Sequence, residues 1–338
     1  MPEEHERAAV AIIVRTKDRP IMLRRALASI GGQTFRDWEA IIVNDGGTPE
    51  AVDEVLAELD ASIRARMRVL HYARSAGRWP TANAGVAGTK APLIVLHDDD
   101  DSWDPDFLTE TVDFLANHPD DRGVIARTEV ILEEYRADAL VVTDRYVLED
   151  HNPHVLLTDL LEFNRFVPIS FVYRRTLHDE IGPYDQELPA AADWTFNMKV
   201  LLRQPIKYVG DRPLAYWHQR PGVDGVLGNS VFAAPLDHRI ADGMFRDDAL
   251  RSFVREHGLG LPLYLAQLFT NRDRSLEAAM EAGEAREVRL NARLDALEAS
   301  LRTLQHHLDR TIDTRVRGWA WRQKRRLRGL RDRGRSAA

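Results

Sequence analysis

The sequence predicts an α/β protein with a largely parallel sheet flanked by helices, followed by a helical extension. Three observations predict this class. Short apolar runs rich in β-branched residues alternate with helical stretches from about residue 8 to residue 122, as in repeated β-α units. Acidic or turn-forming residues directly follow several of these runs. Leucines recur in alternating three- and four-residue steps near the end of the chain, which is typical of a coiled coil.

The first half contains four expected strands and four expected helices. Each strand is a short apolar run that ends at polar residues, and each helix has apolar residues at helical spacing. The expected strands are Val10–Thr16, Trp38–Val43, Arg68–Tyr72 and Leu93–Leu96, and the expected helices are Pro20–Ile30, Pro49–Leu59, Thr81–Gly88 and Pro105–Ala116. Thr48 and Asp104 are expected to cap two of these helices. Because ligands bind beyond the carboxyl ends of parallel strands, residues that follow the first, second and fourth strands are site candidates.

The second half is less regular. Beyond about Gly123 we expect four strands and one clear helix, and we interpret them as a second half of the same domain, with a separate fold as the alternative. The strands are Val124–Leu132, Leu140–Val147, Ile169–Tyr173 and Tyr208–Trp217, and the helix is Asp193–Leu202.

Composition excludes several classes of protein. The chain has 338 residues and no cysteine, so disulfides, thiolate nucleophiles and Cys-ligated zinc are excluded. The net charge is −7, but residues 310–338 carry +9 and the rest carries −16, so we expect no nucleic-acid partner for the body. The acidic start lacks the pattern of a signal peptide, and no apolar run is long enough to cross a bilayer. We therefore expect a soluble, cytoplasmic protein.

The strongest chemical signal is the run His97-Asp98-Asp99-Asp100-Asp101, directly after an expected strand. Four adjacent carboxylates repel one another unless a cation is present. A hard divalent ion with oxygen ligands satisfies this need and can also bridge to phosphate oxygens. The alternative is an acidic turn that caps the next helix, but Asp104 already suffices for that role.

Four segments together resemble family 2 glycosyltransferases. Asp98–Pro105 is similar to the D-x-D-D-x-W-x-P signature of that family, and Val14–Pro20 resembles the first-strand loop that holds the nucleotide. Val43–Gly47 resembles the second-strand motif whose Asp reads the base. Ile181–Asp185 followed by Ala192–Trp194 resembles the stretch that ends in the catalytic base. The resemblance covers about residues 8 to 230.

The resemblance implies a GT-A fold with a mixed, Rossmann-like sheet. The catalytic domain is expected at 1–235, with a nucleotide-binding half at 8–122 and an acceptor half at 123–235, and the remainder as a helical connector at 236–273, a coiled coil at 274–314 and a basic amphipathic tail at 315–338. The implied activity is metal-dependent, inverting transfer of one sugar from a nucleotide-sugar donor, with UDP the expected nucleotide. The expected acceptor is a glycan or a lipid-linked molecule in surface polysaccharide biosynthesis.

The resemblance also assigns residues to the nucleotide. The expected nucleotide contacts are Thr16, Arg19, Asp45, Arg78, Asn83 and Asp98. A short carboxylate at Asp45 accepts a hydrogen bond from a base N–H, which favours uracil over adenine. Relatives often carry Arg-Asn at Ala82-Asn83, and we expect Arg78 to replace the lost charge.

The remaining implied roles concern the metal and the acceptor. Asp100 matches the ligand of Mn²⁺ or Mg²⁺, and His218 matches a late histidine that would be a second ligand; its alternative is an ordinary polar surface group. Asp99 and Asp101 are expected to orient that site. Asp193 matches the general base, and its other expected role, as the cap of its own helix, is compatible with the first. Trp79 and Trp194 are expected either to pack on a sugar ring or to belong to the core.

Departures from the family pattern leave alternatives open. Relatives usually carry Glu where this chain has Ala192, which keeps open a catalytically weak scaffold or binding protein organised by its coiled coil. A nucleotidyltransferase would need a glycine-rich phosphate loop, which Arg15–Arg19 lacks. The Q-x-x-R-W motif of processive synthases is absent.

The end of the chain has its own pattern. Apolar residues at heptad spacing between 276 and 308 predict a homo-oligomeric coiled coil, with an amphipathic helix packed on its own domain as the alternative. The segment 315–335 mixes Trp319 and Trp321 with many arginines. It is expected either to lie on an anionic membrane as a peripheral contact or to remain a solvated basic tail.

Overall fold

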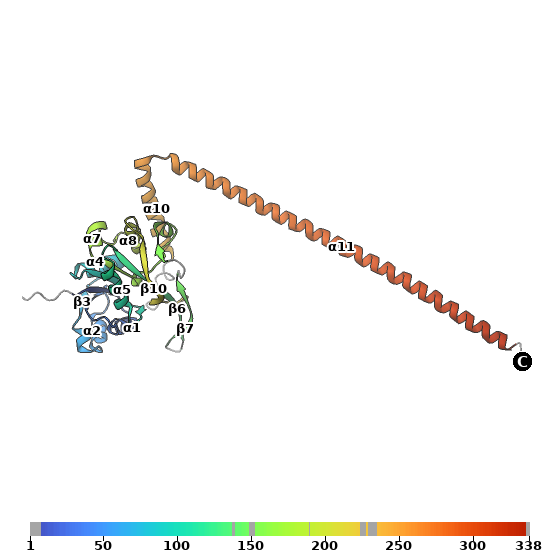
Figure 1. Cartoon of the computed structure of the whole chain (residues 1–338), viewed down its shortest axis with the longest axis horizontal. Coiled ribbons are helices and arrows are strands. Elements are labelled where there is room, and N and C mark those ends of the chain that lie inside the picture. Colours follow the sequence, from blue (N-terminus) through green and yellow to red (C-terminus); the bar gives the residue numbers. More distant parts are fainter. Residues whose placement is uncertain are drawn as a thin grey trace, which may run out of the picture. The chain divides into compact units, whose positions relative to one another are not determined.

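A computed structural model of the chain describes residues 8–136, 139–148, 153–188, 190–223, 228 and 235–335. Two compact units are present, Met1–Leu250 and Arg251–Ala338. The first unit contains the sheet and its flanking helices, and the second consists mainly of one long helix (Figure 1).

The first unit is built on a mixed sheet. Its order within the described residues is β3-β2-β1-β4-β9-β6-β10-β5, with β7 paired to β6 and β8 paired to β10. The strands are β1 (Val10–Thr16), β2 (Trp38–Asn44), β3 (Met67–His71), β4 (Leu93–Asp98), β5 (Ser102–Trp103), β6 (Gly123–Arg136), β7 (Ala139–Leu148), β8 (His154–Val155), β9 (Phe171–Arg174) and β10 (Ile206–Gln219). The strands β1 to β4 are mutually parallel, whereas β9 runs antiparallel to both β4 and β6.

Helices cover both faces of this sheet. The alternating side chains of β1 show the division, because Ala11 and Ile13 pack in the core with α4 and α8 while Ile12 and Val14 pack in the core with α1 and α5. The helices of the first half are α1 (Pro20–Gly31), α2 (Pro49–Ala57), α3 (Ala61–Arg64), α4 (Arg78–Ala87) and α5 (Phe107–Asn117). Those of the second half are α6 (Leu157–Leu160), η1 (Pro168–Ser170), α7 (Thr176–Ile181), α8 (Ala192–Leu201) and α10 (Pro235–His257). The expected α/β class with a mixed sheet is therefore confirmed.

Three local differences from expectation lie near the site. The strand β4 continues to Asp98, so the acidic run begins inside the sheet. The helix α4 begins at Arg78 rather than at Thr81, which places Arg78 in its first turn. The expectation that Asp104 caps the helix at Pro105 is wrong, because α5 begins at Phe107 and the Asp104 carboxylate accepts instead from the backbone N–H of Asp106 (3.0 Å).

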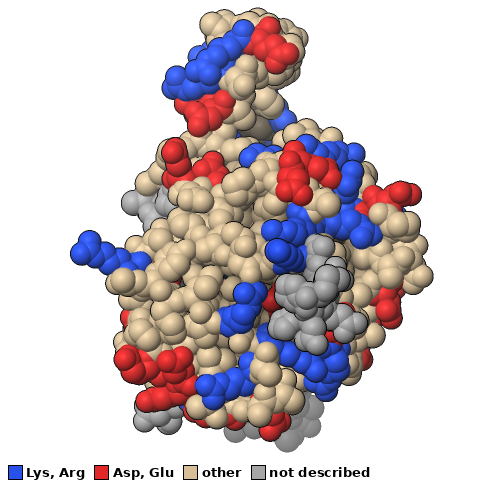
Figure 2. Space-filling model, turned by 90° about the vertical axis from the view of Figure 1, so that its left-hand side faces the viewer, with Lys and Arg blue, Asp and Glu red and all other residues tan. Residues whose placement is uncertain are grey.

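Charge is unevenly distributed over the first unit. On the face drawn in Figure 2, Lys and Arg gather right of centre, and Asp and Glu are spread over the rest. The strongly negative sum of this part of the chain is therefore not a uniform acidic surface on that face.

The second unit is dominated by α11 (Gly260–Arg335). This helix runs without interruption through segments that the sequence assigned to the connector, the coiled coil and the tail. Its heptad leucines are solvent-exposed; Leu294, Leu297 and Leu301 are 56%, 62% and 63% exposed. Among the described helices, none combines the length and the apolar character that crossing a bilayer requires.

Candidate active site

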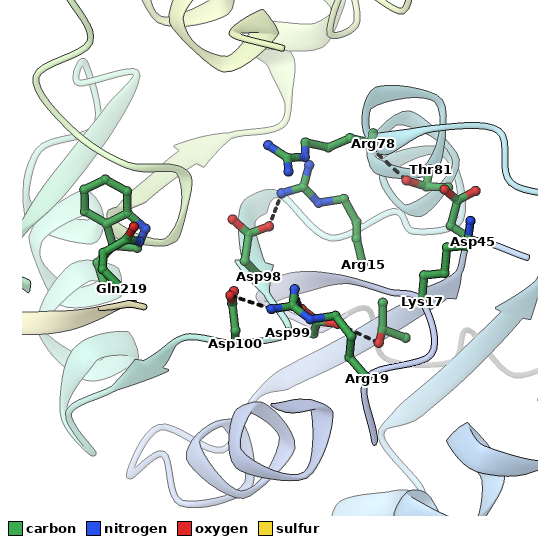
Figure 3. A pocket seen from close by; sticks show the side chains of 12 residues that line it. Arg15, Lys17, Arg19, Asp45, Arg78, Thr81, Asp98, Asp99, Asp100 and Gln219 are labelled. Atoms are coloured by element: carbon green, nitrogen blue, oxygen red, sulfur yellow. Dashed lines mark hydrogen bonds and ion pairs between the residues drawn. The ribbon is translucent and has the colours of Figure 1, made fainter. Parts of the chain in front are cut away.

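A pocket lies beyond the carboxyl ends of β1, β2, β4 and β10, where the parallel-sheet argument places a ligand site (Figure 3). We call it the first pocket, and its volume is about 200 Å³. Six sequence-predicted residues line it: Thr16, Arg19, Asp45, Arg78, Asp98 and Asp100. Arg15, Lys17, Thr81, Asp99, Trp217 and Gln219 complete the lining.

Arginines neutralise the acidic run at the end of β4. Arg15 comes from the last residues of β1, and Arg19 comes from the loop that follows β1. The Arg15 guanidinium donates to Asp98. Asp99 accepts from the Thr16 hydroxyl (2.7 Å) and from Nη1 of Arg19 (2.8 Å). These bonds tie the end of β1 to the end of β4, which are neighbours in the sheet.

A second group of contacts surrounds Asp100. Its carboxylate accepts from Nη2 of Arg19 (2.8 Å) and from Arg220, and its backbone carbonyl accepts from Arg25. Arg220 and Arg25 also donate to the Glu133 carboxylate, at 3.1 and 2.7 Å. Arg220 is fully buried, so these two carboxylates provide the countercharge that makes its burial tolerable.

The acidic side chains differ in proton affinity because their neighbours differ. Burial raises the pKa of Asp99 to about 7, although Arg19 opposes the change. Burial also raises the pKa of Asp101, and the nearby charges of Asp100 and Asp98 add to it. For Asp100 burial acts in the same direction, but Arg19 and Arg220 more than offset it and its pKa is lowered. Asp100 is therefore held in its charged form, unlike Asp99 and Asp101, whose pKa values are raised.

His218 lies behind the first pocket rather than in its lining. Its Nδ1 donates to Glu133 (2.8 Å), and burial lowers the pKa of the ring, so Nε2 accepts from the Ser102 hydroxyl (2.8 Å). Its backbone N–H donates to Asp101 (2.9 Å). Metal binding by His218 stays a prediction. In this structure both of its ring nitrogens are hydrogen-bonded, one to Glu133 and the other to Ser102.

A second pocket, of about 540 Å³, adjoins the first. Both pockets share a wall made of Arg15, Arg78, Asp98 and Trp217. The second pocket is largely apolar, and its other lining residues are Trp79, Leu148, Glu162, Phe163, Asn164, Phe166, Val167, Pro168, Ala191, Asp193, Trp194 and Asp242. The expected base and both expected sugar-contacting tryptophans therefore lie together, across the shared wall from the acidic run.

Asp193 lies in the first turn of α8, after Ala191 has adopted a left-handed backbone conformation (φ 63°). That conformation strains a non-glycine residue, and such strain is common next to functional groups. The Asp193 carboxylate accepts from Nδ2 of Asn164 (2.8 Å). Burial raises the pKa of Asp193, while the positive charge of Arg78 opposes the rise. The N-cap position of α8 is Ala191, so Asp193 is not the N-cap residue, although backbone N–H groups at the start of the helix, those of Trp194 and Asp193, also act to lower its pKa.

Asp45 shapes one end of the first pocket. Its carboxylate accepts from the Ser75 hydroxyl (2.7 Å) and from the backbone N–H groups of Ala76 (2.6 Å) and Gly77 (3.2 Å). The next residue must be glycine, because a Cβ on Gly46 would lie 2.4 Å from the Ser75 nitrogen. The loop before α4 is thus fixed against the end of β2.

Arg78 lines both pockets and forms no ion pair with any described residue. Burial and the neighbouring Arg15 charge lower its pKa, and Asp98 and Asp193 oppose the change. Figure 3 shows its side chain reaching the same part of the pocket as Arg15. Of the two guanidinium groups here, only that of Arg15 is paired with a carboxylate, that of Asp98. The remaining positive charge of Arg78 favours an anionic ligand.

Three other expected residues are partly or wholly structural. Asn83 lines neither pocket and exchanges hydrogen bonds with the backbone of Tyr184, at 2.8 and 3.0 Å. Trp79 stacks on Tyr184 with ring centroids 5.5 Å apart. The Trp194 indole N–H donates to the Leu160 carbonyl (2.7 Å). Both tryptophans are nearly buried, so each contributes an edge to the second pocket while packing in the core.

Several residues of the site were missed from the sequence. Arg15 and Lys17 stand inside the quoted first-strand motif, which is a signal that could have found them. Glu133, Gln219 and Arg220 carry no local signal, because their partners and the pocket come together only through the pairing of β6 with β10.

The chemistry of the first pocket fits a hard divalent ion in part. The second oxygen of Asp98 has no hydrogen bond to any described residue, and this side chain is 33% exposed. Asp98 therefore offers an oxygen ligand for Mn²⁺ or Mg²⁺, and Asp100 offers a carboxylate that Arg19 and Arg220 hold ionised. In the described part of the chain, no group of three or more carboxylates and histidines is arranged to hold an ion. Phosphate oxygens and water would have to complete its coordination.

Comparisons with known proteins agree with this geometry. The model of the family described as glycosyl transferase family 2 matches residues 11–182. The chain is 29% identical over 261 residues to the uncharacterized glycosyltransferase YwdF of Bacillus subtilis, covering 74% of this chain and 85% of the relative. It is 26% identical over 190 residues to a PGL/p-HBAD biosynthesis glycosyltransferase of Mycobacterium tuberculosis, covering 56% and 68%.

Two solved structures show a more distant likeness. S. aureus TarS 1–349 in complex with UDP-GlcNAc has a TM-score of 0.48 and 18% identity, and the match covers 63% of this chain and 59% of that one. The mannosyltransferase PcManGT of Pyrobaculum calidifontis, in complex with GDP-Man and Mn²⁺, has a TM-score of 0.45 and 16% identity, with 64% and 57% covered. The chain therefore spans less than two thirds of either structure's length.

The network around Glu133 gives a testable prediction. In Glu133→Gln, the buried Arg220 and the half-buried Arg25 lose a shared countercharge, so the free energy of unfolding should fall by about 3 kcal/mol in urea denaturation at pH 7. Glu134→Gln, next along the strand and exposed, should change it by about 1 kcal/mol or less. Equal stabilities of the two variants would contradict this network.

The same carboxylate predicts a pH dependence. Burial opposes its ionisation, but His218, Arg25 and Arg220 lower the pKa of Glu133 from 4.5 to about 2. The stability it contributes is complete above pH 4.5 and is lost as the pH falls towards 2. Glu133→Gln should lack this part of the acid dependence.

Proposed function

The chain belongs to glycosyltransferase family 2, and on that premise we propose that it transfers one sugar from a nucleotide-sugar donor to a hydroxyl of a glycan or lipid-linked acceptor, with inversion at the anomeric carbon. One observation carries the proposal. The acidic run after β4 and the Asp193 carboxylate line two adjoining pockets that share the Asp98 side chain. A donor in the first pocket and an acceptor in the second pocket would meet at that wall.

The donor end is supported by residue chemistry. Asp45 stands at one end of the first pocket, and a carboxylate that already orders its loop can accept a further hydrogen bond from an imide N–H, which favours a uracil base. Lys17, Arg15 and Arg78 supply positive charge to the same pocket, and Arg78 has no ion pair within the described residues. This arrangement suits a diphosphate.

We propose that Asp98 and Asp100 hold a Mn²⁺ or Mg²⁺ ion together with the donor. When bound, such an ion stabilises the negative charge that develops on the leaving diphosphate. The paired arginines Arg19 and Arg220 keep Asp100 ionised and in place, since they lower its pKa and fix its carboxylate.

The reaction itself is a displacement in which Asp193 acts as general base. The acceptor oxygen forms a bond to the anomeric carbon, and the bond between that carbon and the diphosphate oxygen breaks. The acceptor proton moves to the Asp193 carboxylate, and the nucleoside diphosphate leaves. Burial raises the pKa of Asp193, which strengthens it as a base, and the bond from Asn164 fixes its orientation.

The alternative of an inactive scaffold rests on Ala192, and its position weakens that alternative. Ala192 is fully buried and lines neither pocket. The alanine therefore removes no carboxylate from the lining of either pocket, and Asp193 remains in place.

The direct test is a donor panel. The chain is mixed with UDP-glucose, UDP-galactose, UDP-GlcNAc and GDP-mannose, each with Mn²⁺ or with EDTA, and donor binding and hydrolysis are measured. A true donor at 100 times its Kd should raise the free energy of unfolding by about 2.7 kcal/mol. Asp100→Asn should abolish the difference in donor binding and hydrolysis between Mn²⁺ and EDTA. Asp113→Asn, at an exposed position on α5, should leave that difference unchanged. Absence of metal-dependent donor binding in the unmodified chain would refute the proposal.

The base is tested by Asp193→Asn. This change removes the proton acceptor while preserving shape, so transfer should slow by about 10²- to 10⁴-fold with donor affinity unchanged. In the unmodified chain, the rate should fall as the pH drops through the raised pKa of Asp193, at a midpoint above 3.8. Asp179→Asn, exposed on α7, serves as the control. Transfer by Asp193→Asn at the normal rate would remove Asp193 from this role.

The helix α11 supports a proposal about assembly. Its exposed leucines repeat at heptad spacing from Leu290 to Leu308, and such a seam is buried when helices associate. We propose a homo-oligomer through 276–308 and a peripheral membrane contact through 315–335, at the cytoplasmic face of a membrane where surface polysaccharide is built.

Both parts are tested with a chain that ends at Asn271. Light scattering should give a multiple of the chain mass for the full protein and a single chain mass for the shortened one. Vesicles with anionic lipid should carry only the full protein in flotation, because the basic tail supplies the attraction. The double variant Leu297→Lys with Leu301→Lys should lose assembly but keep flotation. If the full and the shortened chains contain the same number of chains per particle, the heptad seam does not mediate assembly.

A further inference from the structure

Gln219 is a buried amide without a hydrogen-bond partner in the described part of the chain. It is the last residue of β10 and is 2% exposed, yet neither its Nε2 nor its Oε1 has a hydrogen bond to any described residue. An unsatisfied buried amide is costly, and native proteins retain such groups mainly where a ligand or water satisfies them. Gln219 also lines the first pocket, so a ligand there would reach it.

The strand places Gln219 beside Trp217. Side chains alternate along β10, so Trp217 and Gln219 face the pocket while His218 between them faces Glu133 and Ser102. Trp217 lines both pockets, whereas Gln219 lines the first pocket only. Trp217 therefore belongs to the wall that both pockets share, and Gln219 lies beside it within the first pocket.

The position along the pocket identifies which part of a donor lies there. In Figure 3, Gln219 and Asp45 stand at opposite ends, with Asp98 and Asp100 between them. With the base at Asp45 and the diphosphate at Asp98 and Asp100, as the proposed function requires, the transferred sugar extends towards Gln219. Trp217, beside Gln219 on β10, belongs to the wall that the first pocket shares with the second pocket, and Asp193 lines the second pocket, where transfer requires the anomeric carbon to face.

We infer that Gln219 and Trp217 form the subsite for the transferred sugar, with the Gln219 amide bonding hydroxyl groups of that sugar and the Trp217 ring packing against it. A hydroxyl both donates and accepts, so one or two hydroxyls satisfy both ends of a carboxamide, whereas a phosphate can satisfy only its N–H groups. Because the Gln219 side chain is an uncharged amide, the groups that it would bond are the hydroxyls of a hexose or of its N-acetyl derivative.

The subsite is tested with Gln219→Met, which preserves size and removes the amide. Because the amide bonds none of the described residues, thermal stability should be unchanged or higher. Binding of UDP, or of GDP if GDP-mannose is the donor, should be unchanged, whereas kcat/KM for the best donor of the panel should fall about tenfold. The matched control is Gln33→Met: Gln33 is fully buried but its amide bonds Asp104 and Leu108, so stability should fall and donor discrimination persist.

Deoxy forms of the best donor identify the hydroxyls involved. For the unmodified chain, removing the hydroxyl that Gln219 contacts should lower kcat/KM about tenfold. For Gln219→Met the same removal should change kcat/KM little, since that variant already lacks the bond. If Gln219→Met matches the unmodified chain with every donor and deoxy donor, the subsite is refuted while the proposed transfer stands. If the unmodified chain binds nucleoside diphosphates but no sugar nucleotide, the proposed function and the subsite both fail.

Discussion

The site depends on the neutralisation of a carboxylate run by buried or half-buried guanidinium groups. Arginines from the end of β1, the following loop, α1 and the residue after β10 converge on the end of β4: Arg15, Arg19, Arg25 and Arg220. Unpaired, these charges would make folding of the strand end prohibitively costly, since an isolated buried charge loses its hydration. Paired, they hold the ends of β1, β4 and β10 in one arrangement. The first pocket exists because these three ends are held together.

The same network gives chemically identical aspartate side chains different pKa values. Asp99 and Asp101 have raised pKa values because burial and like charges dominate, whereas two arginines keep Asp100 ionised. Across the shared wall, Asp193 has a raised pKa that suits a proton acceptor. When different environments shift the pKa values of carboxylates in opposite directions, one site can contain both a carboxylate that stays ionised and a carboxylate that accepts a proton. Arg78 and Gln219, which have no partners among the described side chains, then mark where a ligand supplies the missing ones.

Much of the fold followed from pattern, and much of the site did not. The run Val10–Thr16 is apolar and bounded by polar residues, so its strand was predictable to the residue, as were the first residues of α1 and α2 at their prolines. The start of α4 at Arg78 was missed because Trp79 and Pro80 obscure the helical pattern. Four adjacent carboxylates at Asp98–Asp101 require positive charge nearby, but the local sequence does not point to Arg220, which is 120 positions from Asp100 in the chain. Local pattern carries no information on such pairs; they follow from the register of β10 against β6.

The central claim is that a nucleotide sugar spans the first pocket with its reactive carbon at the wall shared with the second. A crystal structure with the identified donor and Mn²⁺ tests this most directly. The account predicts the base at Asp45, the diphosphate at Asp98 and Asp100, and the anomeric carbon facing the second pocket towards Asp193. A diphosphate bound away from the acidic run, or a sugar turned away from Asp193, would contradict it.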